Sequence, residues 1–388
     1  MRRAAIIVLD GVGIGPAHDS RAYGDGDSNT LGNVARVVGG LSLPRLEGFG
    51  LGCCADIQGL SRVASPGAAH GVCEPASPGK DSTTGHWEIC GLILEAPFPT
   101  FPQGFPPDLI GEFARLTSRG VLGNKPASGT AVLDEYGEAH RRSGSWIVYT
   151  SADSVFQVAA HEETVPLSEL YAACATARGI CRGRYGVSRV IARPFLGEPG
   201  GWRRTGNRRD FSLPPPGPTL LDRLAERDIP RMGVGKVDDL FARRGIDSTH
   251  TETNGQAYGL IERALRTMDR GLLLVNVIEF DQSWGHRNDV PGFHRGLLEL
   301  DGVLPQMLAG VRKDDLIIFT ADHGNDPTTP STDHSREAVP VLAFGPRVRP
   351  VNLGRRSTFA DIGQTVADFL EVPALAAGTS FLPEVWID

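Results

Sequence analysis

The chain has 388 residues, of which 40% are hydrophobic and 22% are charged, so it can bury a sizeable core. This length predicts two or three domains. The formal net charge of −7, with no basic block in the sequence, gives no electrostatic reason to expect nucleic acid or an anionic membrane as a partner.

The cysteines and the N-terminus favour a reducing compartment. None of the six cysteines forms a Cys-x-x-Cys pair, and a chain of this size needs no disulfides for stability, so we expect free thiols. The first apolar run, residues 4–9, is too short for the core of a signal peptide, and no run approaches the length of a membrane span. We therefore expect a cytoplasmic protein.

Apolar periodicity and proline clusters predict the elements along the chain. A strand at 4–9 ends at Asp10, and proline clusters near 97–107 and 214–218 stop both helices and strands. The segment between them contains predicted strands at 146–150 and 187–195 around a helix at 167–177. Later elements are expected as helix 219–228, strand 231–234, helix 255–268, strand 272–280, helix 295–308, strand 316–319, strand 339–344 and helix 358–370, with Thr358 and Asp361 as a capping box.

The alternation of strands and helices predicts an α/β fold with a mostly parallel central sheet flanked by helices. The proline-bounded segment predicts a small α+β cap domain inserted into that core. We expect a discontinuous, metal-binding catalytic core at 1–97 and 217–388 and a cap at 98–216.

Metal-ligand residue types follow three predicted strands. The carboxyl ends of parallel strands share one edge of a sheet, so residues far apart in sequence can meet there. Asp and His at such an edge suit divalent metals, although Asp10 alone could be a helix cap and Asp322-His323-Gly324 alone could be a hydrogen-bonded turn that the glycine permits. Six residues exceed the usual ligands of one ion and favour two metals: Asp10, Asp281, His286, Asp322, His323 and His334.

Two other motifs allow a bland and a functional interpretation. The glycines at 11, 13 and 15 resemble a dinucleotide-binding fingerprint, but its last glycine is replaced by Pro16, which favours a plain turn. In the segment from Lys80 to Glu88, Ser82 or Thr83 could simply cap a helix. Alternatively, a hydroxyl at a helix N-terminus beside two cations could act as a nucleophile toward phosphate.

The inserted segment offers hydroxyl, carboxylate and guanidinium groups. Residues 150–154, Arg193 and residues 207–209 could bind a polyhydroxylated anion, because carboxylates accept sugar hydroxyls and arginine binds phosphate in a forked geometry. The bland alternative is that these are ordinary exposed arginines.

Several segments together resemble bacterial phosphopentomutase, of the alkaline phosphatase superfamily, nearly end to end and in order. The segments that carry the resemblance are Asp10 to Gly15, Gly79 to Glu88, Gly123 to Gly129, Tyr149 to Ser154, Ala192 to Phe195 and Thr320 to Pro327.

The resemblance implies an alkaline-phosphatase-like fold and a two-metal enzyme, usually with manganese. Such an enzyme interconverts ribose 1-phosphate and ribose 5-phosphate, and their 2-deoxy counterparts, through a phosphorylated enzyme. It implies Asp281, His286 and His334 as ligands of one metal, and Asp10, Asp322 and His323 as ligands of the other. Ser82 matches the phosphate-bearing position, Ser151, Asp153, Arg193 and Arg208 match cap positions that face the substrate, and Lys236 matches a core lysine near the phosphate.

The sequence departs from the family at two places. Ser82 stands where the family has threonine, and Gly206 stands where relatives tend to have proline. These changes leave open a paralogue acting on a modified pentose phosphate. Two further alternatives are a sugar-phosphate phosphatase, in which water takes the place of the sugar, and a binding protein that keeps the ligands without a competent nucleophile. The preferred pentose, other divalent metals, a bisphosphorylated activator and the oligomeric state, with a monomer plausible, also remain open.

Overall fold

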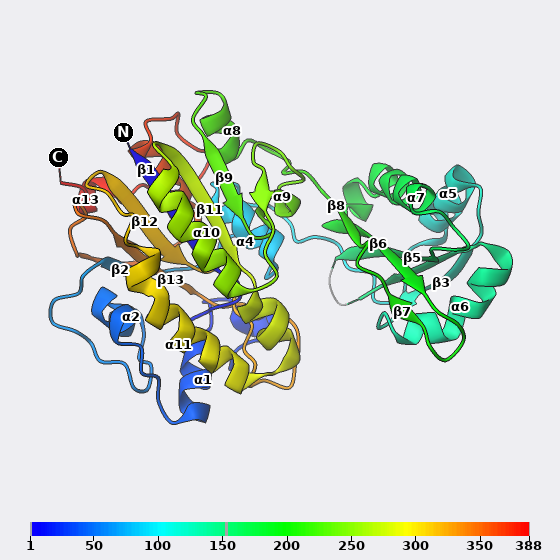
Figure 1. Cartoon of the computed structure of the whole chain (residues 1–388), viewed down its shortest axis with the longest axis horizontal. Coiled ribbons are helices and arrows are strands. Elements are labelled where there is room, and N and C mark those ends of the chain that lie inside the picture. Colours follow the sequence, from blue (N-terminus) through cyan, green and yellow to red (C-terminus); the bar gives the residue numbers. More distant parts are fainter. Residues whose placement is uncertain (1, 152–153, 388) are drawn as a thin grey trace. The chain divides into compact units, whose positions relative to one another are not determined.

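The computed structural model of the chain describes residues 2–151 and 154–387. The chain divides into two compact units, and both crossings between them fall in the proline clusters (Figure 1). The core unit is formed by Met1–Pro97 and Pro215–Asp388, and the cap unit is formed by Phe98–Pro214.

A single sheet organises the core unit, and within the described ranges it has eight strands. It is parallel at five of its seven pairings, because β13 runs antiparallel to both of its neighbours. Every residue of β1, β11 and β12 is buried, as expected for strands covered by helices on both faces. In spatial order the strands are β10 (Ser248–Thr249), β9 (Arg231–Val234), β11 (Gly271–Val277), β1 (Arg3–Leu9), β12 (Asp315–Thr320), β13 (Val339–Phe344), β2 (Ala69–Cys73) and β14 (Asn352–Arg356).

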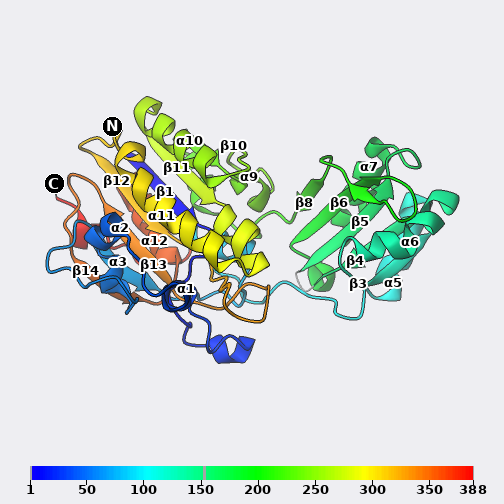
Figure 2. The same ribbon diagram turned by 60° about the horizontal axis from the view of Figure 1, so that its bottom comes forward.

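Helices cover both faces of this sheet, so the predicted α/β core is confirmed. One group packs around the long helices α10 and α11, which lie along one face (Figure 2). This group comprises α1 (Thr30–Val38), α2 (Pro44–Phe49), α10 (Asn254–Thr267) and α11 (Val290–Met307). The other group comprises α4 (Ser82–Ile89), α8 (Leu220–Ala225), α12 (Ala360–Phe369) and α13 (Leu382–Val385). The short elements η1 (Ser20–Tyr23), α3 (Leu51–Cys54) and α9 (Val237–Leu240) lie in connections.

The cap unit is a small α+β domain with its own core, as the fold class predicted. Its sheet has the order β3-β4-β5-β6-β7, with β8 also paired to β6, in the described part of the unit. The strands are β3 (Val121–Pro126), β4 (Trp146–Thr150), β5 (Val155–His161), β6 (Arg189–Leu196), β7 (Arg203–Arg204) and β8 (Arg209–Ser212). The helices are α5 (Pro107–Thr117), α6 (Ala131–Ser143), α7 (Leu167–Ile180) and the short η2 (Gly183–Tyr185).

The predicted strand 272–280 was too long at its C-terminal end. The strand β11 ends at Val277, and the chain continues into a π-helical turn, η3 (Phe280–Trp284), and a 3-10 turn, η4 (Gly285–Arg287). Ile278 and Phe280 are buried, so the apolar run persists although the backbone leaves the sheet. Asp281 therefore projects from a π-helical turn and not from a strand end.

The predicted capping box at Thr358 and Asp361 was wrong. The Thr358 hydroxyl donates to Glu88 at 2.8 Å, and Asp361 binds Arg356 and the Thr379 N–H instead of the start of α12. A true capping box begins α8, where Asp222 accepts from the Thr219 N–H at 2.7 Å. The pattern in sequence cannot show that Glu88, far away in the chain, competes for the threonine hydroxyl.

Candidate functional site

The register of the central strands brings the predicted ligands to one edge of the sheet. In β1, Leu9 pairs with Val277 of β11, and Val8 pairs with Thr320 of β12. Asp10 therefore lies beside the segments that carry Asp281 and Asp322. Gly11 adopts φ +75°, and its backbone N–H donates to Asp322 Oδ1 at 3.2 Å, which locks the turn after β1 against the turn after β12.

A first cluster contains Asp281, His286 and His334. The two Asp281 oxygens each lie 3.3 Å from a histidine Nε2, Oδ2 from His286 and Oδ1 from His334. His286 Nδ1 lies 2.6 Å from the Thr332 carbonyl, which can only accept, so Nδ1 is the donor and Nε2 faces the carboxylate. This arrangement, with the outer ring nitrogen on a carbonyl, is typical of metal-binding histidine.

A second cluster contains Asp10, Asp281 and His323, with Asp322 beside it. His323 Nε2 is 3.2 Å from Asp10 Oδ1 and 3.5 Å from Asp322 Oδ2, while its Nδ1 lies 3.0 Å from the Gly324 carbonyl. In each cluster one ligand atom per residue lies within 4.8 Å of the others, and Asp281 belongs to both. The predicted six residues are thus gathered in one place, with Asp281 between the two clusters.

The charges of these groups depend strongly on one another. Burial, and then the neighbouring carboxylates Asp322 and Asp281, raise the pKa of Asp10. Burial opposes ionisation of Asp281, but His334 and His286 hold its pKa well below the usual range. Burial likewise disfavours the imidazolium of His323, yet Asp322 and Asp10 raise its pKa well above the usual value. Three buried carboxylates therefore lie among three imidazoles, a concentration of buried charge that bound cations would help to balance.

Divalent metals fit this site. The Asp322 Oδ2 atom is buried and has no hydrogen-bond partner in the described part of the chain, although His86 Nδ1 lies 3.1 Å away. Carboxylate oxygens and imidazole nitrogens are the donor set that Mn²⁺ and Zn²⁺ accept. The orphaned oxygen and the carbonyl-bound histidines support metal binding by these residues.

Ser82 is the first residue of α4 and points to the second cluster. Its Oγ lies 3.1 Å from His323 Nε2 and 3.4 Å from Asp10 Oδ1. The interpretation of Ser82 or Thr83 as the helix N-cap is wrong, because Asp81 occupies that position and accepts from the Thr84 N–H at 3.0 Å. Since Asp81 caps the helix, the Ser82 hydroxyl is available at the helix N-terminus.

The other hydroxyls of this motif are differently placed. The Thr84 hydroxyl donates to Asp81 Oδ2 at 2.6 Å, and the Thr83 side chain is buried.

Gly324, which the sequence suggested as a turn, is needed for a close approach, because a Cβ there would lie 2.4 Å from Glu337 Oε1.

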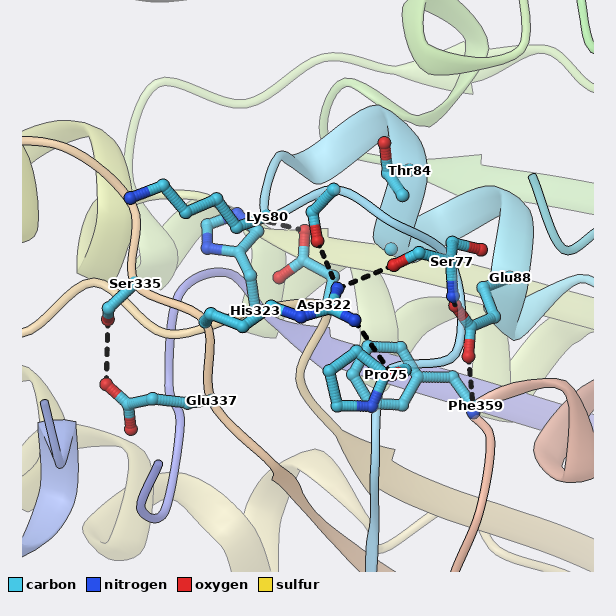
Figure 3. Close-up of a pocket in the computed structure, with 13 residues that line it drawn as sticks. Pro75, Ser77, Lys80, Thr84, Glu88, Asp322, His323, Ser335, Glu337 and Phe359 are labelled. Carbon is cyan, nitrogen blue, oxygen red and sulfur yellow. Dashed lines mark hydrogen bonds and ion pairs between the residues drawn. The ribbon is translucent and has the colours of Figure 1, made fainter. Parts of the chain in front are cut away.

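A pocket beside the second cluster is shown in Figure 3, with Asp322 and His323 on one side and Ser77, Thr84 and Glu88 on the other. Lys236, also in the core unit, donates to Gln282, the neighbour of Asp281.

The predicted cap residues lie in the cap unit. Arg193 Nε donates to Gln157 at 3.0 Å, and Arg208 forms a two-pronged pair with Asp210 at 2.7 Å for both contacts. Burial, and then the cations Arg208 and Arg204, lower the pKa of Arg193 to about 10. Ser151 is half-buried next to the end of β4, and Asp153 lies outside the described residues.

Three polar residues of the site were missed. Asn276 Nδ2 donates to Asp10 Oδ2 at 2.9 Å, and Asn325 Nδ2 donates to Asp281 Oδ1 at 2.7 Å. His86 Nδ1 lies 2.9 Å from the Ser82 carbonyl and 3.1 Å from Asp322 Oδ2. The available signal was an asparagine inside the apolar run of β11, since a buried amide needs a polar partner.

Comparisons with known proteins agree with this geometry. The model of the Metalloenzyme superfamily matches residues 2–374. The chain is 53% identical over 387 residues to a phosphopentomutase of Dictyoglomus turgidum, covering 99% of this chain and 98% of that protein. It is also 53% identical over 386 residues to a phosphopentomutase of Anaeromyxobacter sp. (strain K), covering 99% of each chain.

A solved structure shares the fold. Leishmania mexicana phosphoglycerate mutase matches with a TM-score of 0.50 and 14% identity, over 100% of this chain and 98% of that one. The expected fold class, an alkaline-phosphatase-like core with an inserted cap, is therefore confirmed. With matches of this extent, the chain belongs to the phosphopentomutase family of the Metalloenzyme superfamily.

Proposed function

We propose that the protein is a phosphopentomutase that interconverts α-D-ribose 1-phosphate and D-ribose 5-phosphate, and the 2-deoxyribose equivalents. The observation that carries this proposal is the position of Ser82, whose hydroxyl is 3.1 Å from His323 Nε2 at the N-terminus of α4. The proposed reaction needs a nucleophile beside a two-metal site, and relatives that are 53% identical bear the phosphopentomutase name.

The proposed metals are two Mn²⁺ ions. Asp281, His286 and His334 would hold one ion, and Asp10, Asp322 and His323 would hold the other. Bound divalent metals neutralise the oxygens of a transferring phosphoryl group and lower the pKa of a nearby hydroxyl.

Ser82 is the proposed carrier of the phosphoryl group. Phosphorylated Ser82 would transfer its phosphoryl group to the 5-hydroxyl of ribose 1-phosphate; the new P–O bond forms as the serine P–O bond breaks, and the hydroxyl proton passes to the departing serine oxygen. The free serine would then take the phosphoryl group from the sugar 1-oxygen, which receives the serine proton, so that ribose 5-phosphate is released and the phosphoenzyme is restored. This cycle gives a bisphosphorylated sugar the role of activator, because it can phosphorylate an idle enzyme.

The cap unit is proposed to bind the sugar and exclude water. Arg193, Arg208 and Ser151 are the proposed sugar-binding residues of the cap unit, and Asp153 is included by its position in the motif. Lys236 of the core unit is proposed to bind the phosphate. The lowered pKa of Arg193, due to burial and the nearby Arg208 and Arg204, supports anion binding there, because an anion would relieve the repulsion among these cations. The proposed setting is the cytoplasm, with the protein acting as a monomer on small pentose phosphates.

A phosphatase acting on sugar phosphates is the second candidate. Serine replaces the family's threonine at position 82, and without the methyl group the phosphoserine has more rotamers in which water can approach. A mutase that prefers a modified pentose is the third candidate, because Gly206 replaces the proline that relatives tend to have in the loop before Arg208.

The fate of the phosphate distinguishes these functions. Purified protein loaded with Mn²⁺ and primed with ribose 1,5-bisphosphate is given α-ribose 1-phosphate, and ribose 5-phosphate and free phosphate are measured together. We expect ribose 5-phosphate as the main product. Release of mainly free phosphate would establish the phosphatase, and neither product from ribose or deoxyribose would indicate another sugar.

A further inference from the structure

Arg336 is a buried charged residue that has not been given a role above. Its side chain is only 2% exposed, and it lies two residues after His334 in the sequence. All five of its N–H donors are used. Nε and Nη2 bind the two oxygens of Asp19, each at 3.0 Å, and the remaining donors bind the backbone carbonyls of Pro75, Ser77 and Gly79.

The three carbonyls belong to the loop that leads into Asp81 and Ser82. Arg336 binds the Ser77 carbonyl at 2.6 Å and the Pro75 carbonyl at 3.0 Å, and it also reaches Gly79. The pocket in Figure 3 lies between this loop and Asp322 and His323. One side chain therefore binds the carbonyls of every second residue, 75, 77 and 79, in the loop just before the proposed nucleophile.

The amide groups of the same loop are held by α4. Glu88 accepts from the Ala76 N–H at 2.8 Å and from the Ser77 N–H at 2.7 Å. Because the carbonyls bind Arg336 and these amides bind Glu88, the loop has little freedom to move relative to either partner. Buried hydrogen bonds of this kind specify one backbone conformation.

A segment after β1 supports Arg336 from the other side. Asp19 neutralises its charge, and the Tyr23 ring centroid lies 4.9 Å from the guanidinium carbon. Asp25 accepts a hydrogen bond from the backbone N–H of Arg336 at 2.9 Å, and it forms an ion pair with Lys80 at 3.1 Å. The acidic side chains of residues 19–25 thus connect the segment that carries His334 to the loop that carries Lys80.

We propose that Arg336 is a positioning residue for phosphoryl transfer. It holds the loop at residues 75–80 so that the Ser82 hydroxyl stays beside His323 and Asp10, and it does so without touching Ser82 or the substrate. This inference rests on the proposed function of Ser82. Arg336 lies two residues after His334 and binds the loop before Ser82. It therefore connects the segment of a proposed metal ligand to the proposed nucleophile and aligns the two.

Arg3 is a matched control. It is also 2% exposed and also combines one carboxylate, Asp315, with three backbone carbonyls, those of Leu265, Met268 and Gly310. Arg3 begins β1, so it lies at the opposite end of that strand from Asp10. Loss of Arg3 leaves the Asp315 side chain buried at 1% exposure, whereas the Asp19 side chain is 31% exposed, so Arg3→Lys is the more severe test of stability. Of the two arginines, Arg336 is the one that contacts the loop before Ser82.

The test compares Arg336→Lys, Arg336→Ala and Arg3→Lys with the wild-type chain, all loaded with Mn²⁺ and assayed for bound metal. We measure thermal stability, kcat and KM, and the rate of Ser82 phosphorylation by ribose 1,5-bisphosphate in a single turnover. Hydrogen exchange of the amides at residues 76–82 provides a readout that does not depend on activity.

Both lysine variants are expected to lose stability. The Arg336 variants should in addition lose kcat and phosphorylation rate by about 100-fold at unchanged KM and metal content, as expected for a nucleophile displaced by about 1 Å. Their amides at 76–82 should exchange faster, and millimolar guanidinium should partly restore Arg336→Ala. Arg3→Lys should keep the wild-type kcat and exchange at this loop.

Three results would overturn the inference. The first is a normal phosphorylation rate in folded Arg336 variants, and the second is an equal loss of kcat in Arg3→Lys. The third is an activity loss that follows metal content alone. If the wild-type chain itself is never phosphorylated at Ser82, the proposed function fails first and the inference fails with it.

Discussion

Gly85 shows how a single residue sets the approach of α4 to the turn after β12. A Cβ at this position would lie 2.2 Å from the Asp322 backbone oxygen, so α4 can approach the turn after β12 only with glycine there. The short distance between Ser82 and His323 depends on this approach.

Gly85→Ala is therefore expected to abolish most activity, although alanine normally favours a helix. The matched control is Gly259→Ala in α10, where a Cβ would meet nothing within 4 Å. That variant should be more stable by about 0.5–1 kcal/mol and fully active. Denaturant unfolding and turnover measure both effects, and an active Gly85→Ala protein would contradict this role.

Asp322→Asn tests the ligand assignment at the residue scale. The amide keeps the shape of the side chain but removes the charge opposite His323 and His86, so metal affinity should fall by roughly 100-fold. Asp301→Asn is the control, because Asp301 is equally buried but accepts from the Arg45 and Leu46 N–H groups at the start of α2. Metal titration by calorimetry should show a loss of metal affinity in Asp322→Asn and none in Asp301→Asn. Full metal occupancy in Asp322→Asn would refute the assignment.

At the scale of elements, a buried histidine joins α6 to the cap sheet. His140 Nδ1 donates a hydrogen bond to the Ser145 carbonyl at 2.6 Å, and Nε2 accepts one from the backbone N–H of His161 at 2.8 Å. The second contact requires the neutral ring, because Nε2 can accept only when it carries no proton. Burial lowers the pKa of His140 below its ordinary value near 6.5, and the neighbouring His161 and Arg119 act in the same direction.

The pH dependence of cap stability follows from this shift. Below about pH 6.5, His140 becomes protonated in the unfolded chain but stays neutral in the folded cap, because its pKa is lower there. The free energy of unfolding is therefore at its full value above pH 6.5 and decreases as the pH falls. The loss should reach at most about 1.4 kcal/mol per pH unit. Unfolding followed by cap tryptophan fluorescence should show this slope, and the slope should shrink in His140→Asn, which keeps the donor to Ser145. If the free energy of unfolding had the same pH dependence in the wild type and in His140→Asn, the proposed role of His140 would be contradicted.

The sequence predicted elements well where burial follows a regular period. Strands β4, β9 and β13 have the predicted bounds, because their ends coincide with changes in polarity. The end of β11 was misplaced, since the π-helical turn around Asp281 is as apolar as the strand before it. The Asp81 cap, the Thr358 contact with Glu88 and the five bonds of Arg336 depend on chain crossings that local patterns do not contain.

At the scale of the whole molecule, the six proposed metal ligands all lie in the core unit. Within residues 2–151 and 154–387, no helix is long and apolar enough to cross a membrane. The core sheet collects ligands from both ends of the chain, from Asp10 to His334. We therefore expect metal binding by these residues to stabilise the folded, discontinuous core.

Metal removal should therefore destabilise the core unit selectively. A ligand that binds only the folded state adds about 2.7 kcal/mol at 100 times its Kd, and a chelator removes that contribution. Calorimetry with and without chelator should show a lower transition temperature for the core and an unchanged transition for the cap. Equal shifts of both transitions, or none, would contradict metal binding by the core alone.

The most direct test of the account is to locate the phosphoryl group during turnover. Mn²⁺-loaded protein is mixed with ribose 1,5-bisphosphate, quenched with acid, digested and analysed by peptide mass spectrometry. We expect one phosphoryl group on Ser82, which disappears into a sugar bisphosphate when ribose 1-phosphate is added. Formation of ribose 5-phosphate with Ser82 unmodified, or with the phosphoryl group on Thr83 or Thr84, would contradict the account.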